Sequence, residues 1–150
     1  MITTKEIKAL REETGLSVMQ CQKALEEAKG DKSKAIELLK KKGNEIARKK
    51  GDRTLGAGVV ASYIHTGEKV GVMLELLCET DFVSKNPEFK SVARDIGMHI
   101  AAMKPSDTKE LLEQPFIKDP SLKVSDLISN TVQKFGERTE VGRFVRFSLD

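Results

Sequence analysis

The sequence is poor in cysteine and has no apolar run that could cross a membrane. A spanning helix needs roughly 20 apolar residues, and the N-terminal residues also lack the apolar core of a secretory signal. Cys21 and Cys78 lie in segments that we expect to belong to different domains. Isolated cysteines are typical of a reducing compartment and not of a disulfide framework. We therefore expect a cytoplasmic protein that does not bind a membrane.

The chain also lacks the motifs of nucleotide binding, metal binding and catalysis. It has no GxxxxGKS or GxxxxGKT loop for phosphates, and Gly56–Gly58 precedes a predicted strand, whereas a dinucleotide-binding glycine loop follows one. His65 and His99 are too widely separated to predict a metal site with the cysteines. Glu75 and Glu79 share the polar face of one predicted strand, with no nucleophile nearby. We expect neither an enzyme nor a bound cofactor.

The composition is that of a globular protein with a hydrated surface. Hydrophobic residues make up 39% and charged residues 33% of the 150 positions. A net charge of +3 is too small to indicate nucleic-acid binding by itself. The length suits one domain, or a small domain joined to a modest one.

Three short helices are predicted before residue 50. The first two begin with capping boxes, Thr3–Glu6 and Ser17–Gln20, in which a hydroxyl caps the helix and a longer side chain reaches back. Asp31 is expected to cap the third helix, whose inward-facing apolar residues precede Gly43. We predict a helical bundle over residues 1–50 that buries little area and is only marginally stable alone.

Residues 40–53 form a basic segment, with seven Lys or Arg residues against Glu45 and Asp52. One interpretation is a solvated helix end and linker, because cations suit the C-terminal end of a helix dipole. Another is a nucleic-acid patch, although no aromatic residue stands there to stack on a base. The alternative function is then a small basic RNA- or ribosome-associated protein. An acidic surface on a partner protein would fit the segment equally well.

The second part of the chain predicts a mixed fold. Residues 51–58 are a linker, and residues 59–150 are the core domain. The predicted order is β-β-α-α-β, with elements at Val59–His65, Val70–Cys78, Pro87–Met103, Asp126–Phe135 after a Ser125 cap, and residues 139–150. The fold class is α+β, a three-helix bundle followed by a three-stranded antiparallel sheet covered by helices.

The apolar pattern also predicts which residues face the core. On the second strand they are Val70, Val72, Leu74, Leu76 and Cys78. On the helix that begins at Pro87 they are Phe89, Val92, Ala93, Ile96, Ile100 and Met103. In the last strand, one parity contains Val141, Val145, Phe147 and Leu149, and the other contains Phe144.

The stretch between the second strand and the following helix carries the candidate functional residues. After Cys78 the chain reads Glu79-Thr80-Asp81-Phe82-Val83, and then Asn86-Pro87 starts a helix. We predict about seven loop residues, in which Asp81 and Phe82 have no evident structural duty. Loops held between rigid elements commonly present function. The alternative is that Asp81 caps a turn and Phe82 folds back as a plug of the core.

The strings CETDFVSKNPEF, residues 78–89, and ARDIGMHIAA, residues 93–102, resemble bacterial elongation factor Ts. That family is the guanine nucleotide exchange factor for the GTPase elongation factor Tu. The resemblance implies that Thr80, Asp81, Phe82 and Val83 disturb the Mg²⁺ and phosphate site of the GTPase. It also implies a ubiquitin-associated-like N-terminal domain that docks near Val18 and Met19. No direct contact with nucleic acid is expected.

The chain is shorter than the family pattern. Members carry a helical insertion between segments that correspond here to Ala102–Pro105 and Leu111–Asp119. Larger members add a second core copy and a C-terminal module. In those members the second core copy covers one face of the sheet. Here that face would expose Met73, Leu77 and either Phe144 or the pair Val145 and Phe147, so we expect a homodimer.

Overall fold

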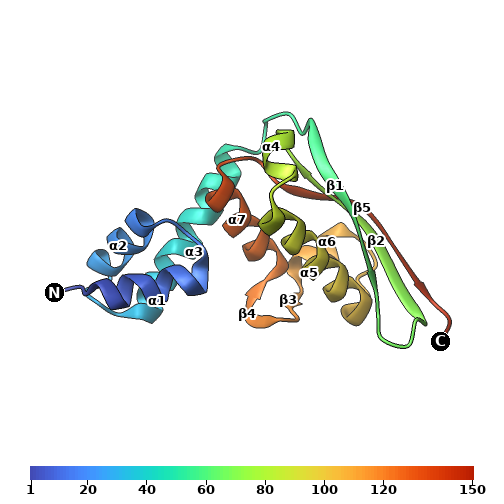
Figure 1. The fold of residues 1–150 in the computed structure, drawn as a ribbon, viewed down its shortest axis with the longest axis horizontal. Coiled ribbons are helices and arrows are strands. Elements are labelled where there is room, and N and C mark those ends of the chain that lie inside the picture. The colour runs from blue at the N-terminus through green and yellow to red at the C-terminus, as the bar shows by residue number, and fades with distance from the viewer.

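The computed structural model describes residues 1–150 as a helical bundle, a sheet and the helices that cover it (Figure 1). The elements are α1 (Thr4–Thr14), α2 (Val18–Glu27), α3 (Lys32–Lys49), β1 (Ala57–Ile64), β2 (Val70–Cys78), α4 (Asp81–Ser84), α5 (Pro87–Met103), α6 (Thr108–Glu113), β3 (Pro115–Phe116), β4 (Asp119–Lys123), α7 (Val124–Phe135) and β5 (Glu140–Ser148). The predicted α+β class is therefore confirmed. None of the helices combines the length and the apolar character that crossing a bilayer requires.

The N-terminal bundle consists of α1, α2 and the first half of α3. Both predicted capping boxes are present: the Thr3 hydroxyl accepts the backbone N–H of Glu6, and the Ser17 hydroxyl accepts that of Gln20, each at 3.2 Å. Gly15 ends α1 at φ 71°, in the left-handed region that glycine tolerates. The bundle has its own hydrophobic core, made of Leu10, Leu16, Cys21, Ala24, Leu25, Ala28, Ala35 and Leu39.

The third helix continues through Gly43 to Lys49, so this glycine does not mark the end of the helix. Gly43 is buried because α7 crosses α3 at this point. A β-carbon here would lie 3.0 Å from Nε2 of Gln133 and 3.4 Å from the carbonyl oxygen of Ser129. Because glycine has no side chain, α3 and α7 can approach closely at this position. The sequence around Gly43 does not show that another helix packs there.

Two side-chain hydrogen bonds fix the bundle against α7. The Gln133 side-chain amide donates to the carbonyl oxygen of Leu39 at 3.1 Å, and that of Asn130 donates to the carbonyl oxygen of Thr14 at 3.2 Å. Gln133 is buried. The bundle is thus joined to the rest of the molecule by packing as well as by the chain between α3 and β1.

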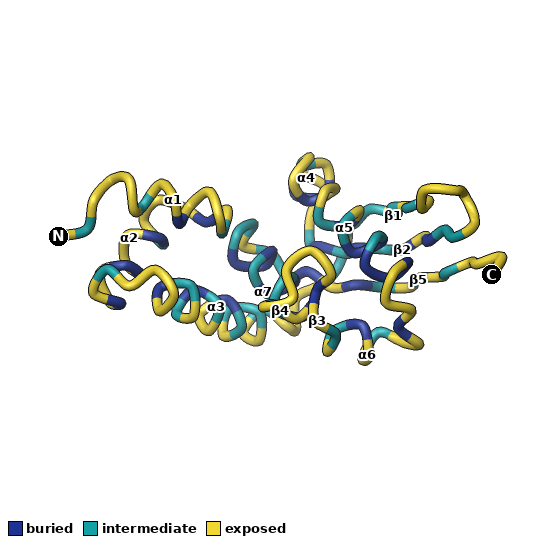
Figure 2. Tube along the Cα trace, turned by 90° about the horizontal axis from the view of Figure 1, so that it is seen from below, coloured by how far each residue is buried: buried dark blue, intermediate teal, exposed yellow.

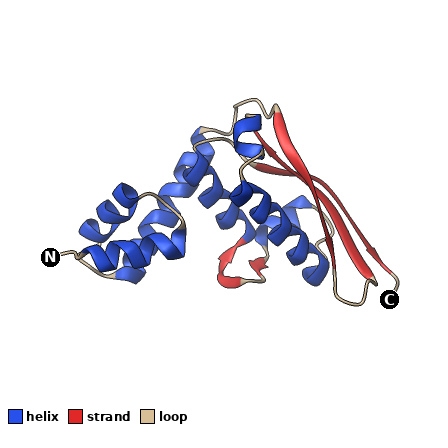
Figure 3. Cartoon of the chain, viewed as in Figure 1, coloured by secondary structure: helices blue, strands red, loops and turns tan.

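The long strands form an antiparallel sheet in the order β1-β2-β5, with β2 in the centre. β2 pairs with a strand on each side, and its Val72, Leu74 and Leu76 are buried, whereas Met73 on its other face is 53% exposed. The turn between β1 and β2 contains Gly67 at φ 93°. All helices lie on one side of the sheet, and the other side is uncovered (Figure 3).

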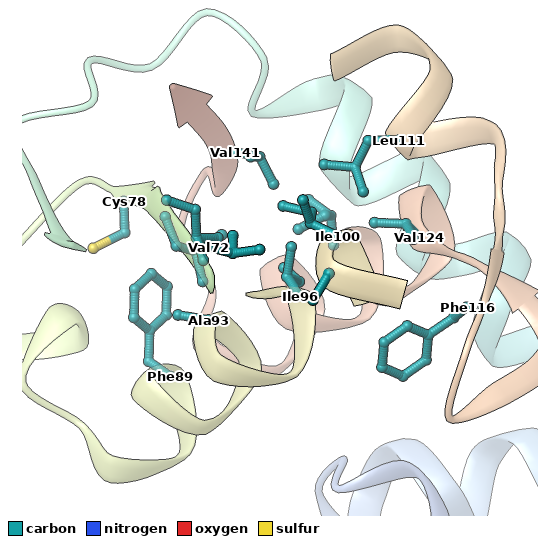
Figure 4. Packing of buried hydrophobic residues seen from close by; sticks show 14 of the residues in the cluster. Val72, Cys78, Phe89, Ala93, Ile96, Ile100, Leu111, Phe116, Val124 and Val141 are labelled. Atoms are coloured by element: carbon teal, nitrogen blue, oxygen red, sulfur yellow. The ribbon is translucent and has the colours of Figure 1, made fainter. Parts of the chain in front are cut away.

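The main hydrophobic core lies between the sheet and α5, α6 and α7 (Figure 4). Its buried residues are Val72, Leu74, Leu76, Cys78, Val83, Phe89, Ala93, Ile96, Ile100, Ala101, Leu111, Phe116, Val124, Ile128 and Val141. The predicted inward face of β2 is confirmed. Met103, which we predicted on the buried side of α5, is 40% exposed because the helix ends there.

A β-bulge decides which side chains of β5 face the core. Leu74 pairs with Phe144 and Leu76 with Val141, so β5 uses one residue more than β2 between these two pairs. The extra residue changes the parity, and both Val141 and Phe144 turn inward. Val145, predicted to share a face with Val141, lies on the opposite face and is 40% exposed.

The bulge is stabilised by an ion pair on the outer face of the sheet. Glu75 accepts the backbone N–H of Arg143 at 2.8 Å and hydrogen bonds from its guanidinium at 3.1 and 2.8 Å. These bonds lower the pKa of Glu75 to about 2. The carboxylate therefore stays ionised throughout the physiological pH range.

The segment after α6 forms a small hairpin of β3 and β4, in which Pro115 pairs with Lys123. His99 attaches this hairpin to α5: its Nδ1 accepts the N–H of Ile117 at 3.1 Å and its Nε2 lies 2.9 Å from Oε1 of Gln114. His99 is fully buried, and burial lowers its pKa. The next helix, α7, is preceded by Lys123 and not by the predicted cap Ser125, and it ends at Gly136, which has φ 74°.

Candidate functional site

The segment between β2 and α5 folds into the four-residue helix α4 in place of an open loop. Thr80 is the N-cap, and its hydroxyl oxygen accepts the backbone N–H of Val83 at 3.5 Å. Asp81 is the first residue of the helix and does not cap it. As predicted, Asn86 caps α5 and Pro87 stands in its first turn. The segment is thus capped at Thr80 and again at Asn86.

Phe82 is 88% exposed, so the interpretation of this ring as a core plug is wrong. Asp81 beside it is exposed as well. The two following residues, Val83 and Ser84, are each only 4% exposed, and Val83 belongs to the main core. Figure 2 shows α4 as an exposed turn at the margin of the molecule. The buried residues Val83 and Ser84 therefore anchor a segment on which Asp81 and Phe82 are exposed to solvent.

Glu137, just beyond the end of α7, binds the start of this segment. Its Oε1 accepts the backbone N–H groups of Glu79 at 3.1 Å and Thr80 at 3.0 Å. Its Oε2 accepts the hydroxyl of Thr80 at 2.6 Å. Hydrogen bonds to an ionised acceptor are stronger than neutral ones. One carboxylate thus receives three donors from two consecutive residues.

The contact is reciprocal, because Glu79 binds the segment that carries Glu137. The Glu79 carboxylate accepts the backbone N–H of Arg138 at 2.5 Å and lies 3.5 Å from the Arg53 guanidinium. The Arg138 side chain in turn donates to the carbonyl oxygen of Arg53 at 2.5 Å. The end of β2, the α7–β5 turn and the segment before β1 are therefore tied together beneath α4.

Cys78 lies directly before this segment and is fully buried. Its thiol is 3.3 Å from the carbonyl oxygen of Thr80. Burial, and secondarily the Glu137 carboxylate, raise the pKa of the Cys78 thiol. The sulfur is thus a packed thiol and not a nucleophile. No group of three or more His, Cys, Asp or Glu side chains could hold a metal ion.

Val18 and Met19 form a second exposed apolar site. They begin α2 and are 50% and 69% exposed, whereas Cys21 behind them is fully buried in the bundle. In Figure 1, α2 lies on the upper side of the bundle and α4 at the upper end of the sheet. The structure keeps the two predicted contact regions at separate places, on the bundle and on the core.

Matches to known proteins cover nearly the whole chain. The family model described as Elongation factor TS matches residues 4–110 and 79–150. Proteins named Elongation factor Ts from Carboxydothermus hydrogenoformans and Thermodesulfovibrio yellowstonii are each 42% identical over 99% of this chain, and over 89% and 96% of their own lengths. One from Synechococcus sp. is 38% identical over 99% of this chain and 88% of its own length. The chain belongs to the elongation factor Ts family.

The chain is also shorter than its relatives in the elongation factor Ts family. The alignment with the Carboxydothermus protein spans 194 positions and this chain has 150 residues, so at least 44 positions have no counterpart here. At the predicted place of the shortening, Lys104–Asp107 alone connects α5 to α6. Lys104 adopts φ 50° there, and Asp107 caps α6 by accepting the N–H of Glu110 at 2.8 Å. The short connection is a regular, capped one.

The basic segment of this elongation factor Ts family member is largely the second half of α3, where Lys41, Lys42 and Arg48 are exposed. Lys40 pairs with Asp126 of α7 at 3.2 Å, and Arg53 lies 3.5 Å from Glu79. Two of the seven cations thus pair within the chain. These two cations bind other parts of the chain itself, and the remaining five form no ion pair within it.

Glu137 and Arg138 were missed at the level of sequence. The signal available was Gly136, which correctly predicts the end of α7. Nothing in the local pattern indicates that the next side chain returns to Thr80, since the hydrogen bond joins residues 57 positions apart. The exposed residues Asp81 and Phe82 could be predicted from the neighbouring sequence. Glu137 and Arg138, which hold the segment in place, could not.

Proposed function

We propose that this chain is a translation elongation factor that acts in the cytoplasm as a guanine nucleotide exchange factor for elongation factor Tu. One observation supports the proposal most directly. Phe82, in a chain of this family, is 88% exposed on a segment anchored from both sides. A large apolar ring left in water forgoes the stabilisation that burial would give and contributes nothing within the monomer. It is suited to a site on a partner.

Exchange needs no bond chemistry. A GTPase that binds GDP with nanomolar affinity has about 12 kcal/mol of binding free energy. A factor that binds the empty GTPase more tightly than the loaded one must, by linkage, weaken the nucleotide by the same factor. Each tenfold loss of nucleotide affinity corresponds to about 1.4 kcal/mol. The factor acts through differential binding and contributes no catalytic group.

Asp81 and Phe82 provide the two local effects. The Phe82 ring inserts between side chains of the GTPase and displaces the elements that hold Mg²⁺ and the phosphates. The Asp81 carboxylate, brought close to that site, disfavours the phosphate charge or disturbs the water shell of the metal. Because α4 is already capped and anchored, docking orders few groups and its entropic cost is small.

Thr80 and Val83 serve the same site from behind. The hydroxyl of Thr80 is occupied by Glu137 and by the N–H of Val83. The side chain of Val83 is packed in the core. These two residues therefore act by presenting Asp81 and Phe82, and the direct contacts with the GTPase fall to the exposed pair.

The N-terminal bundle is the second point of attachment. We propose a ubiquitin-associated-like domain over residues 1–50 and a core domain that begins with β1 at Ala57, two residues before the predicted boundary at residue 59, so that the linker is residues 51–56. Val18 and Met19 would dock on the nucleotide-binding domain of the GTPase. A second docked module raises the effective concentration of the first without changing its action.

We propose that a second copy of the chain covers the outer face of the sheet. Each strand contributes exposed apolar residues there, namely Val60, Ile64, Met73, Val145 and Phe147. Of the alternatives in the sequence, the Val145 and Phe147 pair lies on this face and Phe144 does not. Two such sheets pack face to face about 10 Å apart. Two exchange factors would then bind two GTPases.

Light scattering at micromolar concentration tests the homodimer. We expect twice the 16.6 kDa mass of the chain, and a monomer after Phe147→Glu. The substitution buries a carboxylate in an apolar interface, which is costly. A wild-type mass of 16.6 kDa would contradict the dimer.

The exchange function is tested by the release of fluorescent GDP from elongation factor Tu, with and without this protein. We expect the protein to accelerate release in proportion to its concentration until the GTPase is saturated. No acceleration at any concentration would contradict the proposal. The RNA-associated alternative predicts instead that the protein is retained on RNA with a steep dependence on salt.

A further inference from the structure

We propose that Glu137 is a positioning residue for nucleotide exchange, which holds Thr80 and thereby fixes the direction in which Asp81 and Phe82 leave the core. The inference rests on the proposed exchange function and extends it to a residue outside α4. Glu137 lies beyond the end of α7 and is only partly exposed. Its side chain is directed at the other segment, and its effect on a partner is exerted through Thr80.

The first argument is the direction of the Thr80 hydroxyl. The hydroxyl donates to Oε2 of Glu137 at 2.6 Å, and its oxygen accepts the N–H of Val83 at 3.5 Å. With the hydrogen directed at the carboxylate, a lone pair remains free for the first turn of α4. Glu137 therefore orients the cap of the helix that carries Phe82.

The second argument is that Glu137 is itself firmly held. Gly136 reverses the chain at φ 74° while its N–H donates to the carbonyl oxygen of Val132 at 2.8 Å. The hydroxyl of Thr139 donates to the carbonyl oxygen of Glu137 at 3.2 Å. The next residue, Arg138, donates its N–H to the Glu79 carboxylate at 2.5 Å. The acceptor thus belongs to a turn whose position is set by α7 and by β5.

The third argument is that α4 depends on its anchors. A helix of four residues is too short to be stable alone, because nucleation is costly and few hydrogen bonds repay it. Val83 secures its end in the core. Glu137 secures its beginning. β2 and α5 are packed independently of Glu137, so its loss would loosen the segment without unfolding the domain.

The test compares Glu137→Ala and Glu137→Gln with a matched control. The control is Glu113→Ala, which also removes a carboxylate, here one in an exposed pair with Lys123 at 3.2 Å. Three quantities are measured: the maximal rate of GDP release from elongation factor Tu at saturating protein, the melting temperature, and the hydrogen exchange of the Glu79 and Thr80 amides. The amide exchange reports the contact itself, independently of the GTPase.

We expect Glu137→Ala to lower the maximal rate of release roughly tenfold, since a small misplacement of a positioned group is costly. The Glu79 and Thr80 amides should exchange faster, while the amides of β2 and the melting temperature stay close to wild type. Glu137→Gln should show an intermediate rate, because its carbonyl oxygen still accepts both amides but its NH₂ group accepts no hydroxyl. Glu113→Ala should match the wild-type protein.

The outcomes separate this inference from the exchange function. If the wild-type protein does not accelerate GDP release from elongation factor Tu, the proposed exchange function is wrong. In that case, unchanged protection of the Thr80 amide from hydrogen exchange in Glu137→Ala would overturn the positioning role as well. If the wild-type protein is active and Glu137→Ala is equally active, the positioning role alone is overturned. It is also overturned if Glu137→Ala loses activity together with a large fall in melting temperature and faster exchange throughout β2, since Glu137 is then a structural residue.

Discussion

Phe82→Ala should reduce the acceleration of GDP release by about 30-fold or more, the size expected for an aromatic anchor at an interface. The free energy of unfolding of the Phe82→Ala protein should be almost unchanged. The ring is 88% exposed, so its truncation leaves no cavity. An exposed substitution usually changes the free energy of unfolding by about 0.5 kcal/mol or less, whereas truncating a core Phe costs about 3–5 kcal/mol.

The measurement pairs the rate of release with thermal unfolding of the same samples. Ile117→Ala is the matched control, because it also removes an apolar side chain, 39% exposed, but in the turn between β3 and β4. It should leave release unchanged. Asp81→Asn should reduce release less than Phe82→Ala, since it keeps the shape and removes only the charge. A Phe82→Ala protein with a much lower melting temperature that still accelerates GDP release from elongation factor Tu would show that the ring is structural.

The main course of the chain could be predicted from sequence because its signals are local. The capping boxes at Thr3 and Ser17 and the Asn86-Pro87 start of α5 all act within one turn of a helix. The apolar residues at every second position of β2 likewise predict its buried face, since successive strand side chains point to opposite faces. Such elements need no knowledge of what packs on them.

Two of the wrong predictions involve contacts between distant segments. Gly43 resembles a helix end, but it is a point of close approach to α7 inside a continuous helix. Val145 and Val141 have the same parity, yet an extra residue beside Glu75 places them on opposite faces. In both cases a segment distant in the sequence determines the local structure. The residues around the position do not indicate which segment that is.

The candidate site divides in the same way. Asp81 and Phe82 stood out because they were unusual for a connection between two packed elements, and Phe82 is indeed exposed. Thr80 and Val83 were predicted as members of the site, but what each does there depends on burial and on Glu137. Exposure of a residue can be inferred from its type and neighbours, whereas the group that fixes it must be found in three dimensions.

Removing the whole bundle would be a poor test of its role in binding the GTPase. α3 packs along α7, and Gln133 of α7 donates to the carbonyl oxygen of Leu39. Deleting residues 1–50 would leave that buried amide without its partner and expose the face of α7 against which Gly43 lies. Water would then solvate the Gln133 amide, but the apolar surface of α7 left exposed would cost about 25 cal/mol per Å². Loss of activity after deletion would mix a binding defect with a folding defect.

The double substitution Val18→Asp and Met19→Asp avoids that difficulty. Both side chains are exposed, at 50% and 69%, and both stand in the first turn of α2. Carboxylates at this end of a helix interact favourably with its dipole, and the Ser17 capping box is kept. We therefore expect a folded bundle that no longer presents an apolar surface to the GTPase.

The double variant should raise the concentration needed for half-maximal GDP release about 10–100-fold, because the bundle supplies effective concentration. The maximal rate should stay that of the wild-type protein, since Asp81 and Phe82 are unchanged. Titration of the release rate, with thermal unfolding as a check on the fold, measures both quantities. Lys5→Ala with Lys8→Ala is the control, because it lowers the net charge equally at exposed positions of α1. If saturating concentrations fail to restore the maximal rate, the bundle itself takes part in displacing the nucleotide, and the division of labour between bundle and α4 is wrong.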